Sequence, residues 1–207
     1  MYVMKAQVQA ISLVLITGIV ISLAGAAYIW GKPLIEKRST ITDIATAESF
    51  MIQLDQQIID AARNRGEKSI SIPALPGASL SINESENSII MNFITTQPML
   101  AMGEESVPVP IDSQNIEAVG TYGESPRTIT LQAKLHESQY MMILKLVYRT
   151  LYTTGTPKRG YAIVLRSGGV TGKDKISVSY EGVETEIVSG ADGDAELVKT
   201  IIKADVS

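Results

Sequence analysis

The residues of this chain that are best suited to catalysis are few and stand apart. The single histidine, His136, neighbours Glu137 in a polar stretch and has the surroundings of a surface turn. Zinc hydrolases and serine-type triads need a histidine with several partners, and no pair of carboxylates or activated serine stands out in this sequence. We therefore expect no enzyme activity, no catalytic residues and no cofactor.

A glycine-rich stretch, residues 168–173, places three glycines ahead of Lys173. A phosphate-binding loop needs a serine or threonine directly after the lysine, and it joins a strand to a helix. Asp174 follows here, and the residues beyond it alternate as a strand does. A hairpin turn is therefore the preferred interpretation of these glycines, and we do not expect nucleotide binding.

A third candidate combines Asp192, Asp194 and Glu196 around a glycine. Alternating carboxylates of this kind can supply oxygen ligands to calcium. The stretch lacks the remaining positions of a complete calcium loop, including the distal glutamate that binds with both oxygens. We predict a turn here, with a calcium site at these carboxylates as the alternative, and we expect no other metal site.

The chain also carries one N-glycosylation sequon, formed by Asn83, Glu84 and Ser85. A sequon marks a surface position in a protein that is exported from the cytosol. If residues 67–207 lie outside the cell, Asn83 is a candidate glycosylation site.

The overall composition excludes some partners. The chain has 207 residues, no cysteine and a net charge of −4 at pH 7. Without cysteine there are no disulfides and no thiolate metal sites, so the domain must rely on its core or on neighbouring subunits. The negative charge argues against nucleic acid as a partner, because phosphate binding needs clustered basic residues. This length accommodates one anchoring helix and one domain of ordinary size.

The elements that position these residues begin with an apolar run over residues 11–30, which contains no charged residue. At about 1.5 Å per residue, a helix of this run is roughly 30 Å long, the thickness of the hydrocarbon core of a bilayer. Tyr28 and Trp30 end the run with rings that favour a membrane interface, and basic residues follow from Lys32 onward. The sequence therefore predicts a helix that spans a membrane or lies in the core of an assembly.

Three interpretations of this helix remain open. A secretory signal peptide would be cleaved near the small residues 24–27, although the run is longer than usual and its leader carries a single basic residue. A plain single-pass anchor needs only the apolar run. The third is a helix that packs against copies of itself, because Gly18, Ser22 and Ala26 lie four residues apart on one face, with Gly25 beside them. Small residues at this spacing let helix backbones approach closely in an apolar medium.

Lys5, Ala6 and Gln7 stand shortly before the apolar run. This arrangement resembles the processing site of archaeal type IV pilins and archaellins. In that family a dedicated peptidase cuts after a small residue that follows a basic one, and the mature chain often begins with glutamine. The resemblance covers roughly residues 4–60, and it implies a leader of residues 1–6 with a cut between Ala6 and Gln7.

The resemblance implies a function as well. The chain would be a structural subunit of an archaeal type IV pilus-like extracellular filament with an adhesive role, held in the membrane as a single-pass protein before assembly. Its partners would be copies of itself, a prepilin-type peptidase and a membrane assembly platform. A minor pilin and an archaellum stator-like or cap-like component are alternatives within the family. A monomeric, membrane-anchored binding module is the alternative outside it.

The helical pattern resumes over residues 33–65. Apolar side chains recur there every three or four residues, which indicates an amphipathic helix that packs on the following domain. Pro33 removes one backbone donor, so we expect a kink at this position. Gly66 is the expected stop, which gives a helical segment over residues 7–66.

Residues 67–207 have the pattern of a β domain. Short apolar or alternating runs are separated by Gly and Pro turn signals, which favours an antiparallel β-sandwich. The expected strands are 68–72, 79–82, 88–95, 107–111, 127–135, 140–153, 161–167, 175–180, 185–188 and 197–204. The predicted fold class is α+β, a long N-terminal hydrophobic helix followed by an antiparallel β-sandwich-like domain.

Overall fold

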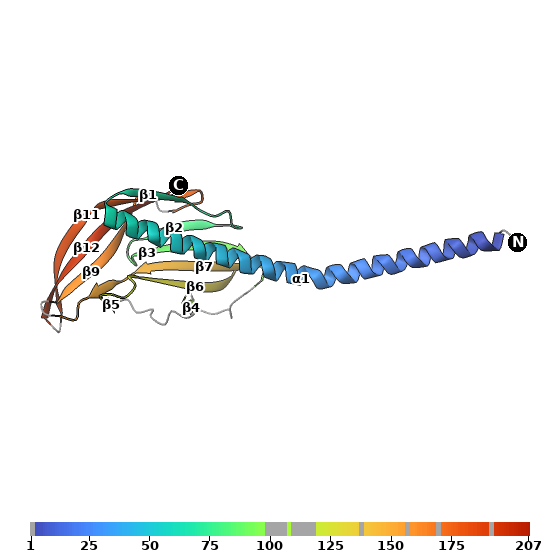
Figure 1. Cartoon of the computed structure of the whole chain (residues 1–207), viewed down its shortest axis with the longest axis horizontal. Coiled ribbons are helices and arrows are strands. Elements are labelled where there is room, and N and C mark those ends of the chain that lie inside the picture. Colours follow the sequence, from blue (N-terminus) through green and yellow to red (C-terminus); the bar gives the residue numbers. More distant parts are fainter. Residues whose placement is uncertain are drawn as a thin grey trace.

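The computed structural model of the chain consists of one long helix and, among the residues that it describes, twelve strands in two sheets (Figure 1). The described residues are 3–97, 107–108, 119–136, 139–155, 158–168, 171–190 and 193–207, and the description leaves out the side chains of residues 3–11, 107–108, 190 and 193. The predicted α+β class, a long helix followed by a β-sheet domain, is confirmed.

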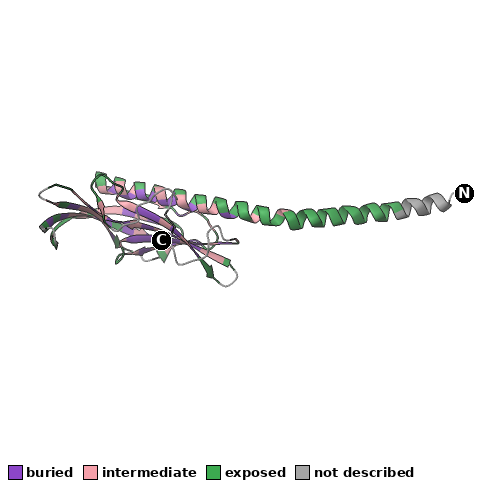
Figure 2. Cartoon of the chain, turned by 90° about the horizontal axis from the view of Figure 1, so that it is seen from below, coloured by how far each residue is buried: buried purple, intermediate pink, exposed green. Residues whose placement is uncertain are grey.

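Helix α1 (Val3–Asn64) runs without interruption through Pro33, which lies near its middle. The helix bends gently there rather than breaking (Figure 1). Its N-terminal half projects away from the domain, whereas its second half lies along the sheets with one face buried (Figure 2). The apolar and amphipathic segments expected from the sequence are therefore two parts of one continuous helix.

The C-terminal end of α1 differs from the prediction in one respect. The left-handed residue that ends the helix is Arg65, with a φ of 52°, and not Gly66. The amide of Gly66 donates a hydrogen bond to the carbonyl of Ala61 over 3.3 Å, which satisfies one of the last helical carbonyl groups. The guanidinium of Arg65 lies 5.8 Å from the centre of the Tyr180 ring, and this cation–π contact offsets part of the cost of the left-handed backbone.

In the described part of the chain, each sheet has six strands. Sheet A has the order β1-β11-β12-β9-β8-β5, formed by Glu67–Ser71, Lys175–Gly190, Gly193–Val206, Arg159–Ser167, Thr150–Tyr152 and Val119–Thr121. Sheet B has the order β10-β2-β3-β7-β6-β4, formed by Thr171–Gly172, Ser79–Asn83, Ser88–Thr95, Gln139–Tyr148, Arg127–His136 and Val107–Pro108. Most neighbours are antiparallel, but β12 with β9 and β5 with β8 are parallel pairs.

The expected single strand over residues 140–153 is two strands in the structure. β7 ends in sheet B and β8 begins in sheet A, so the chain passes from one sheet to the other at Arg149. Arg149 is buried, its Nε donates a hydrogen bond to the carbonyl of Ser125, and its Nη2 pairs with Glu124 at 3.0 Å. A buried charge needs such partners, and they fix the position of the crossing.

The opposite difference occurs in the last hairpin. The sequence predicts separate strands over residues 175–180 and 185–188, but β11 is one strand of 16 residues. Glu181 is accommodated as a bulge, because the register of β11 against β12 shifts there. The short strands β5 and β10 are additional to the prediction, and of the predicted strand 107–111 only Val107–Pro108 lies within the described residues.

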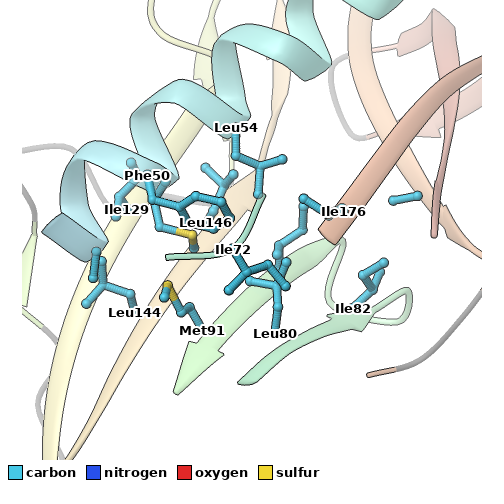
Figure 3. Packing of buried hydrophobic residues seen from close by; sticks show 14 of the residues in the cluster. Phe50, Leu54, Ile72, Leu80, Ile82, Met91, Ile129, Leu144, Leu146 and Ile176 are labelled. Atoms are coloured by element: carbon cyan, nitrogen blue, oxygen red, sulfur yellow. The ribbon is translucent and has the colours of Figure 1, made fainter. Parts of the chain in front are cut away.

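One hydrophobic core joins the helix to both sheets. The buried side chains of α1 are Ala47, Phe50, Met51, Leu54, Ile58 and Ala61. They pack with side chains of both sheets, including Met91 and Leu146 of sheet B and Ile176 of sheet A (Figure 3). A fully buried large apolar side chain contributes about 1.5–3 kcal/mol. The second half of α1 is therefore a structural part of the domain rather than a detachable stalk.

Asn87, which follows β2 in a turn and has a left-handed backbone with a φ of 49°, connects the two sheets. Its Nδ2 donates hydrogen bonds to the carbonyls of Tyr148 in β7 and Ile163 in β9, over 3.1 and 2.6 Å. Its Oδ1 accepts one from the amide of Leu165, over 2.8 Å. One side chain thus satisfies backbone groups of sheet B and of sheet A.

Candidate self-association surface on the helix

The N-terminal half of α1 presents a long apolar surface that nothing in the described part of the chain covers. Its large apolar side chains from Leu13 to Ile35 are between 56% and 82% exposed. Among the described residues, α1 is the one helix that is long and apolar enough to cross a membrane, with a mean hydropathy of 2.2 over its apolar window. Monomeric proteins in water rarely expose continuous apolar surface on this scale. Lipid or protein must therefore cover it.

Small residues open a shallow groove on one face of this surface. Its lining residues are Val14, Leu15, Gly18, Ile19, Ser22 and Leu23. A Cβ atom added at Gly18 or at Gly25 meets no other atom within 4 Å, so the space in front of both glycines is open. Gly25 and Ala26 extend the small residues by a further turn. A second helix can approach the backbone closely along this face.

Two hydroxyl groups on this part of the helix, those of Thr17 and Ser22, have hydrogen-bond partners within it. The Thr17 hydroxyl donates to the carbonyl of Leu13, and the Ser22 hydroxyl donates to the carbonyl of Gly18, both over 2.8 Å. A hydroxyl that bonds to the carbonyl four residues earlier leaves no unpaired donor when water is removed. This face can therefore be buried in an apolar medium without loss of hydrogen bonds.

The end of the apolar surface has the character of a membrane boundary. Tyr28 and Trp30 are 69% and 82% exposed there. Lys32 follows and forms an exposed pair with Glu36 over 3.7 Å. Aromatic rings followed by charges are typical of the depth at which a helix leaves the hydrocarbon layer.

The buried carboxylate of Asp55 joins the helix to sheet B through a hydrogen bond and an ion pair. Asp55 of α1 is 2% exposed, although it lies in the middle of the apolar stripe that faces the domain. Its Oδ1 accepts a hydrogen bond of 2.8 Å from the hydroxyl of Tyr148 in β7, and its Oδ2 lies 2.7 Å from Nη1 of Arg127 in β6. The sequence pattern did not identify this trio. An acidic residue within an apolar helical stripe was the available signal, but nothing local to Asp55 identifies partners more than seventy residues away.

The surroundings of the trio set the protonation of two of its members. Burial raises the pKa of Asp55, and the charge of Arg127 and the hydrogen bond from Tyr148 offset part of this effect. Burial also raises the pKa of Tyr148 well above its ordinary value, and the carboxylate of Asp55 adds to the shift. Tyr148 is therefore held as a neutral donor to Asp55.

The residues of the expected processing site lie at the start of the helix. The backbone of Lys5, Ala6 and Gln7 belongs to α1. Their side chains, and residues 1–2 of the expected leader, lie outside what the structure describes. Cleavage between Ala6 and Gln7 therefore stays a prediction.

The interpretation of residues 168–173 as a hairpin turn is wrong. β10 pairs with β2 of sheet B and not with β9, which precedes it in sheet A. The segment instead carries the chain from one sheet to the other. The amides of Lys173 and Asp174 then donate hydrogen bonds to the carbonyl of Ser207, over 3.2 and 2.8 Å. Gly172, directly before these residues, likewise lies beside Ser207, next to the C-terminal strand β12.

The described members of the remaining candidates, His136, Asp194 and Glu196, lie at the surface. His136 is exposed at the end of β6. Asp192 lies outside the described residues, and Glu196 forms an ion pair of 3.2 Å with Arg159. The part of the chain that the structure describes contains no cluster of three or more side chains suited to hold a metal ion. Because Asp192 lies outside those residues, the calcium alternative at Asp192, Asp194 and Glu196 stays a prediction.

The sequon forms the turn between β2 and β3. The hydroxyl of Ser85 donates a hydrogen bond of 2.7 Å to Oδ1 of Asn83, and the amide of Glu86 donates a longer one of 3.4 Å to the same atom. Ser85 is exposed, and Asn83 is half-buried at the end of its strand. The turn is thus held by the side chain that a glycan would modify.

Comparisons of the chain with protein-family models, with curated proteins and with solved structures found no match. Its architecture is therefore argued from its own geometry. A long N-terminal helix is apolar and exposed over its first half, and its second half packs on a domain of two β-sheets. This is a pilin-like architecture.

Proposed function

We propose that this chain is a structural subunit of an archaeal type IV pilus-like extracellular filament, assembled through the N-terminal half of α1. The observation that carries the proposal is the exposed apolar surface of residues 13–35 on a helix whose other half is part of the domain core. Because one continuous helix joins the two, bundling of the apolar halves would place a β domain around the outside of the bundle at every subunit.

The same apolar surface suits two environments in succession. Before assembly, residues 11–30 would cross the bilayer, since a helix of this length spans roughly 30 Å. After assembly, the helices would cover one another, and separating them in water would cost about 25 cal/mol for each Å² of apolar surface exposed. Transfer from lipid to protein gains no such hydrophobic energy, so close packing at Gly18, Ser22, Gly25 and Ala26 would select the assembled state.

The proposal assigns partners to other parts of the chain. A prepilin-type peptidase would cut between Ala6 and Gln7, and a membrane assembly platform would move the subunit from bilayer to filament. The β domain would lie outside the cell and make adhesive contacts. The sequon at Asn83, in an exposed turn, is consistent with that location.

A monomeric, single-pass binding module is the second candidate. The features that favour it are Tyr28 and Trp30, both exposed where the apolar run ends, because a permanent anchor needs such an interfacial boundary. A minor pilin and a stator-like or cap-like archaellum component share the architecture of the main proposal and differ from it in copy number.

The decisive experiment is to determine the N-terminal residue of the native protein, by mass spectrometry on material sheared from cells. We expect a chain that begins at Gln7 and is abundant in the sheared fraction. An uncleaved chain that stays with the membrane fraction would favour the anchored module. A chain that begins at Gln7 but is scarce in the sheared fraction would indicate a minor or envelope-bound component.

A further inference from the structure

A second groove lies farther along the same helix, between α1 and the first strand of sheet A. Its helical wall is formed mainly by Thr42, Ala45, Thr46, Ser49 and Gln53, all of them exposed. Its opposite wall is formed by β1 and the residues that follow it, among them Ile70 and Pro73. No part of the described chain fills it.

The groove carries no charge. All ten of its lining residues are apolar, hydroxyl-bearing or amide side chains. Acidic residues are present elsewhere on this half of the helix, at Asp43 and Glu48, but they do not line the groove. An uncharged groove is complementary to an uncharged occupant, because a charge placed there would lose water without gaining a partner.

The hydroxyl groups of the groove repeat the arrangement found in the apolar half. The Thr46 hydroxyl donates a hydrogen bond to the carbonyl of Thr42 over 2.8 Å, and the Thr42 hydroxyl donates to the carbonyl of Arg38 over 3.0 Å. In the first groove, Ser22 bonds to the carbonyl of Gly18 in the same way. At Thr42 and Thr46 the helical wall can therefore be covered by an apolar partner without an unpaired hydroxyl donor.

The small residues of the two grooves are related by a constant offset along the chain. Gly18 and Ser22 line the first groove, and Thr42 and Thr46, each 24 residues later, line the second; Gly25, beside the first groove, corresponds in the same way to Ser49. On an α-helix this offset is about 36 Å along the axis, and it leaves the two faces about 120° apart around it. One subunit therefore presents two different faces, in different directions, at a fixed axial spacing.

We propose that the groove between α1 and β1 receives the apolar half of α1 from a second copy of this chain, with Gly18, Ser22 and Gly25 of one copy against Thr42, Thr46 and Ser49 of the next. The proposal rests on the proposed filament function and names the contact that builds it. Because the two faces differ, the contact is heterologous and does not close on itself, so it propagates as a filament. It also covers with protein an apolar surface that water cannot solvate.

Cysteine cross-linking tests this contact cleanly, because the natural chain has no cysteine. The full chain would carry Ser22→Cys and Thr46→Cys together and would be made in its own cells. The protein would then be oxidised and separated by gel electrophoresis without reductant. A disulfide needs Cα atoms about 4.4–6.8 Å apart, so only a close match of the two faces gives bonds. We expect a ladder of covalent multimers, since each subunit offers one cysteine to each of two neighbours. The matched control is Ser22→Cys with Asp60→Cys, which lies on the same exposed face but about 21 Å beyond Thr46, and we expect no ladder from it.

Single-cysteine variants and a groove-filling variant complete the test. Covalent dimers from Ser22→Cys alone would overturn the proposal, because they require the Ser22 faces of two copies to contact each other.

A groove-filling variant gives a second readout. Thr46→Trp fills the groove, and we expect loss of the protein from the sheared surface fraction, whereas Asp60→Trp leaves that fraction unchanged. Normal filaments from Thr46→Trp, with no ladder from the cysteine pair, would overturn this contact and leave the filament function standing. Absence of self-association in the natural chain would overturn both.

Discussion

The hydroxyl of Tyr148 in β7 donates a hydrogen bond of 2.8 Å to the carboxylate of Asp55 in α1, across the interface between helix and sheet. Arg127 in β6 approaches the other oxygen of the same carboxylate at 2.7 Å. Three elements from distant parts of the chain thus share one buried charge. This relationship fixes the axial and rotational position of the helix on the domain more narrowly than apolar packing does.

Removal of the Tyr148 hydroxyl or of the Asp55 carboxylate should destabilise the domain, the second more than the first. Tyr148→Phe removes one hydrogen bond to a charged group, which costs about 1.5–3 kcal/mol. Asp55→Ala costs more, about 3–5 kcal/mol, because it leaves the charge of Arg127 without its partner. The measurement is the free energy of unfolding in urea, on the full chain in detergent. Equal effects of the two variants, or none, would contradict this account.

Alkaline pH should lower the free energy of unfolding of the domain through Tyr148. The folded protein holds the proton of Tyr148 well above the ordinary pKa of 10.0, whereas the unfolded chain releases it near that value. The unfolded state therefore binds fewer protons at high pH, and the stability contributed by neutral Tyr148 is present below pH 10.0 and falls as the pH rises above it. We expect the fall in unfolding free energy between about pH 9 and about pH 11 to be smaller in Tyr148→Phe. An identical slope in both proteins would show that other groups cause it.

Leucine at Gly18 and Gly25 should block assembly without unfolding the domain. Neither position has an atom within 4 Å of the added Cβ, so the subunit itself has room for the larger side chains. They would fill the groove that a neighbouring helix needs. Gly31→Leu is the matched control, since Gly31 is equally open within the subunit but lies about 140° around the helix from Gly18 and about 120° from Gly25. The readouts are the amount of protein sheared from cells and the unfolding curve. Normal filaments from the double variant would refute the packing role.

Peptide mass spectrometry should find a glycan on Asn83 in protein recovered from cells. The sequon begins at Asn83, the half-buried last residue of β2, and continues into the exposed turn at Glu84 and Ser85. Asn83→Gln and Ser85→Ala should both abolish the added mass, because the first removes the acceptor and the second removes the hydroxyl of the sequon. An unmodified peptide from the natural chain would rule out this site.

Asn87→Asp should be among the most damaging single substitutions in the β domain. The new carboxylate would face the carbonyl oxygens of Tyr148 and Ile163, which now accept hydrogen bonds from the amide of Asn87. Two lost hydrogen bonds, at about 1 kcal/mol each, combine with the cost of oxygen facing oxygen in a half-buried site. Asn87→Gly separates the causes, since it loses the same bonds but suits the left-handed backbone. We expect Asn87→Asp to unfold at lower urea concentration than Asn87→Gly.

The sequence predicts the parts of this fold that depend on local pattern. The uncharged run before Lys32 and the alternation over residues 127–135 identify the helix and β6 because periodicity is a property of neighbouring residues. Arg149 shows where this reasoning ends. The apolar pattern continues past it, and only its distant partners Glu124 and Ser125 reveal that the chain changes sheets there.

The residues of the candidate site also fall into two groups, those that local spacing identifies and those whose role depends on distant partners. Gly18 and Ser22 could be identified from their spacing, because a helix converts spacing directly into a shared face. Asp55 could not, since its role depends on Tyr148 and Arg127, which are brought to it by the packing of the sheets. The groove beside Thr46 likewise needs Ile70 and Pro73 as its second wall, and these are set in place by the pairing of β1 with β11.

The continuity of α1 through Pro33 has a mechanical consequence. A pulling force on the N-terminal half is transmitted along the rod to its second half, which lies lengthwise against the sheets (Figure 1). The load therefore acts in shear, parallel to the interface between helix and sheets. The contacts from Ala47 to Ala61 resist it together instead of breaking one after another. With the carboxylate of Asp55 buried in the middle of this interface, a domain on the surface of the proposed filament would bear tension that would detach a domain held at a single end.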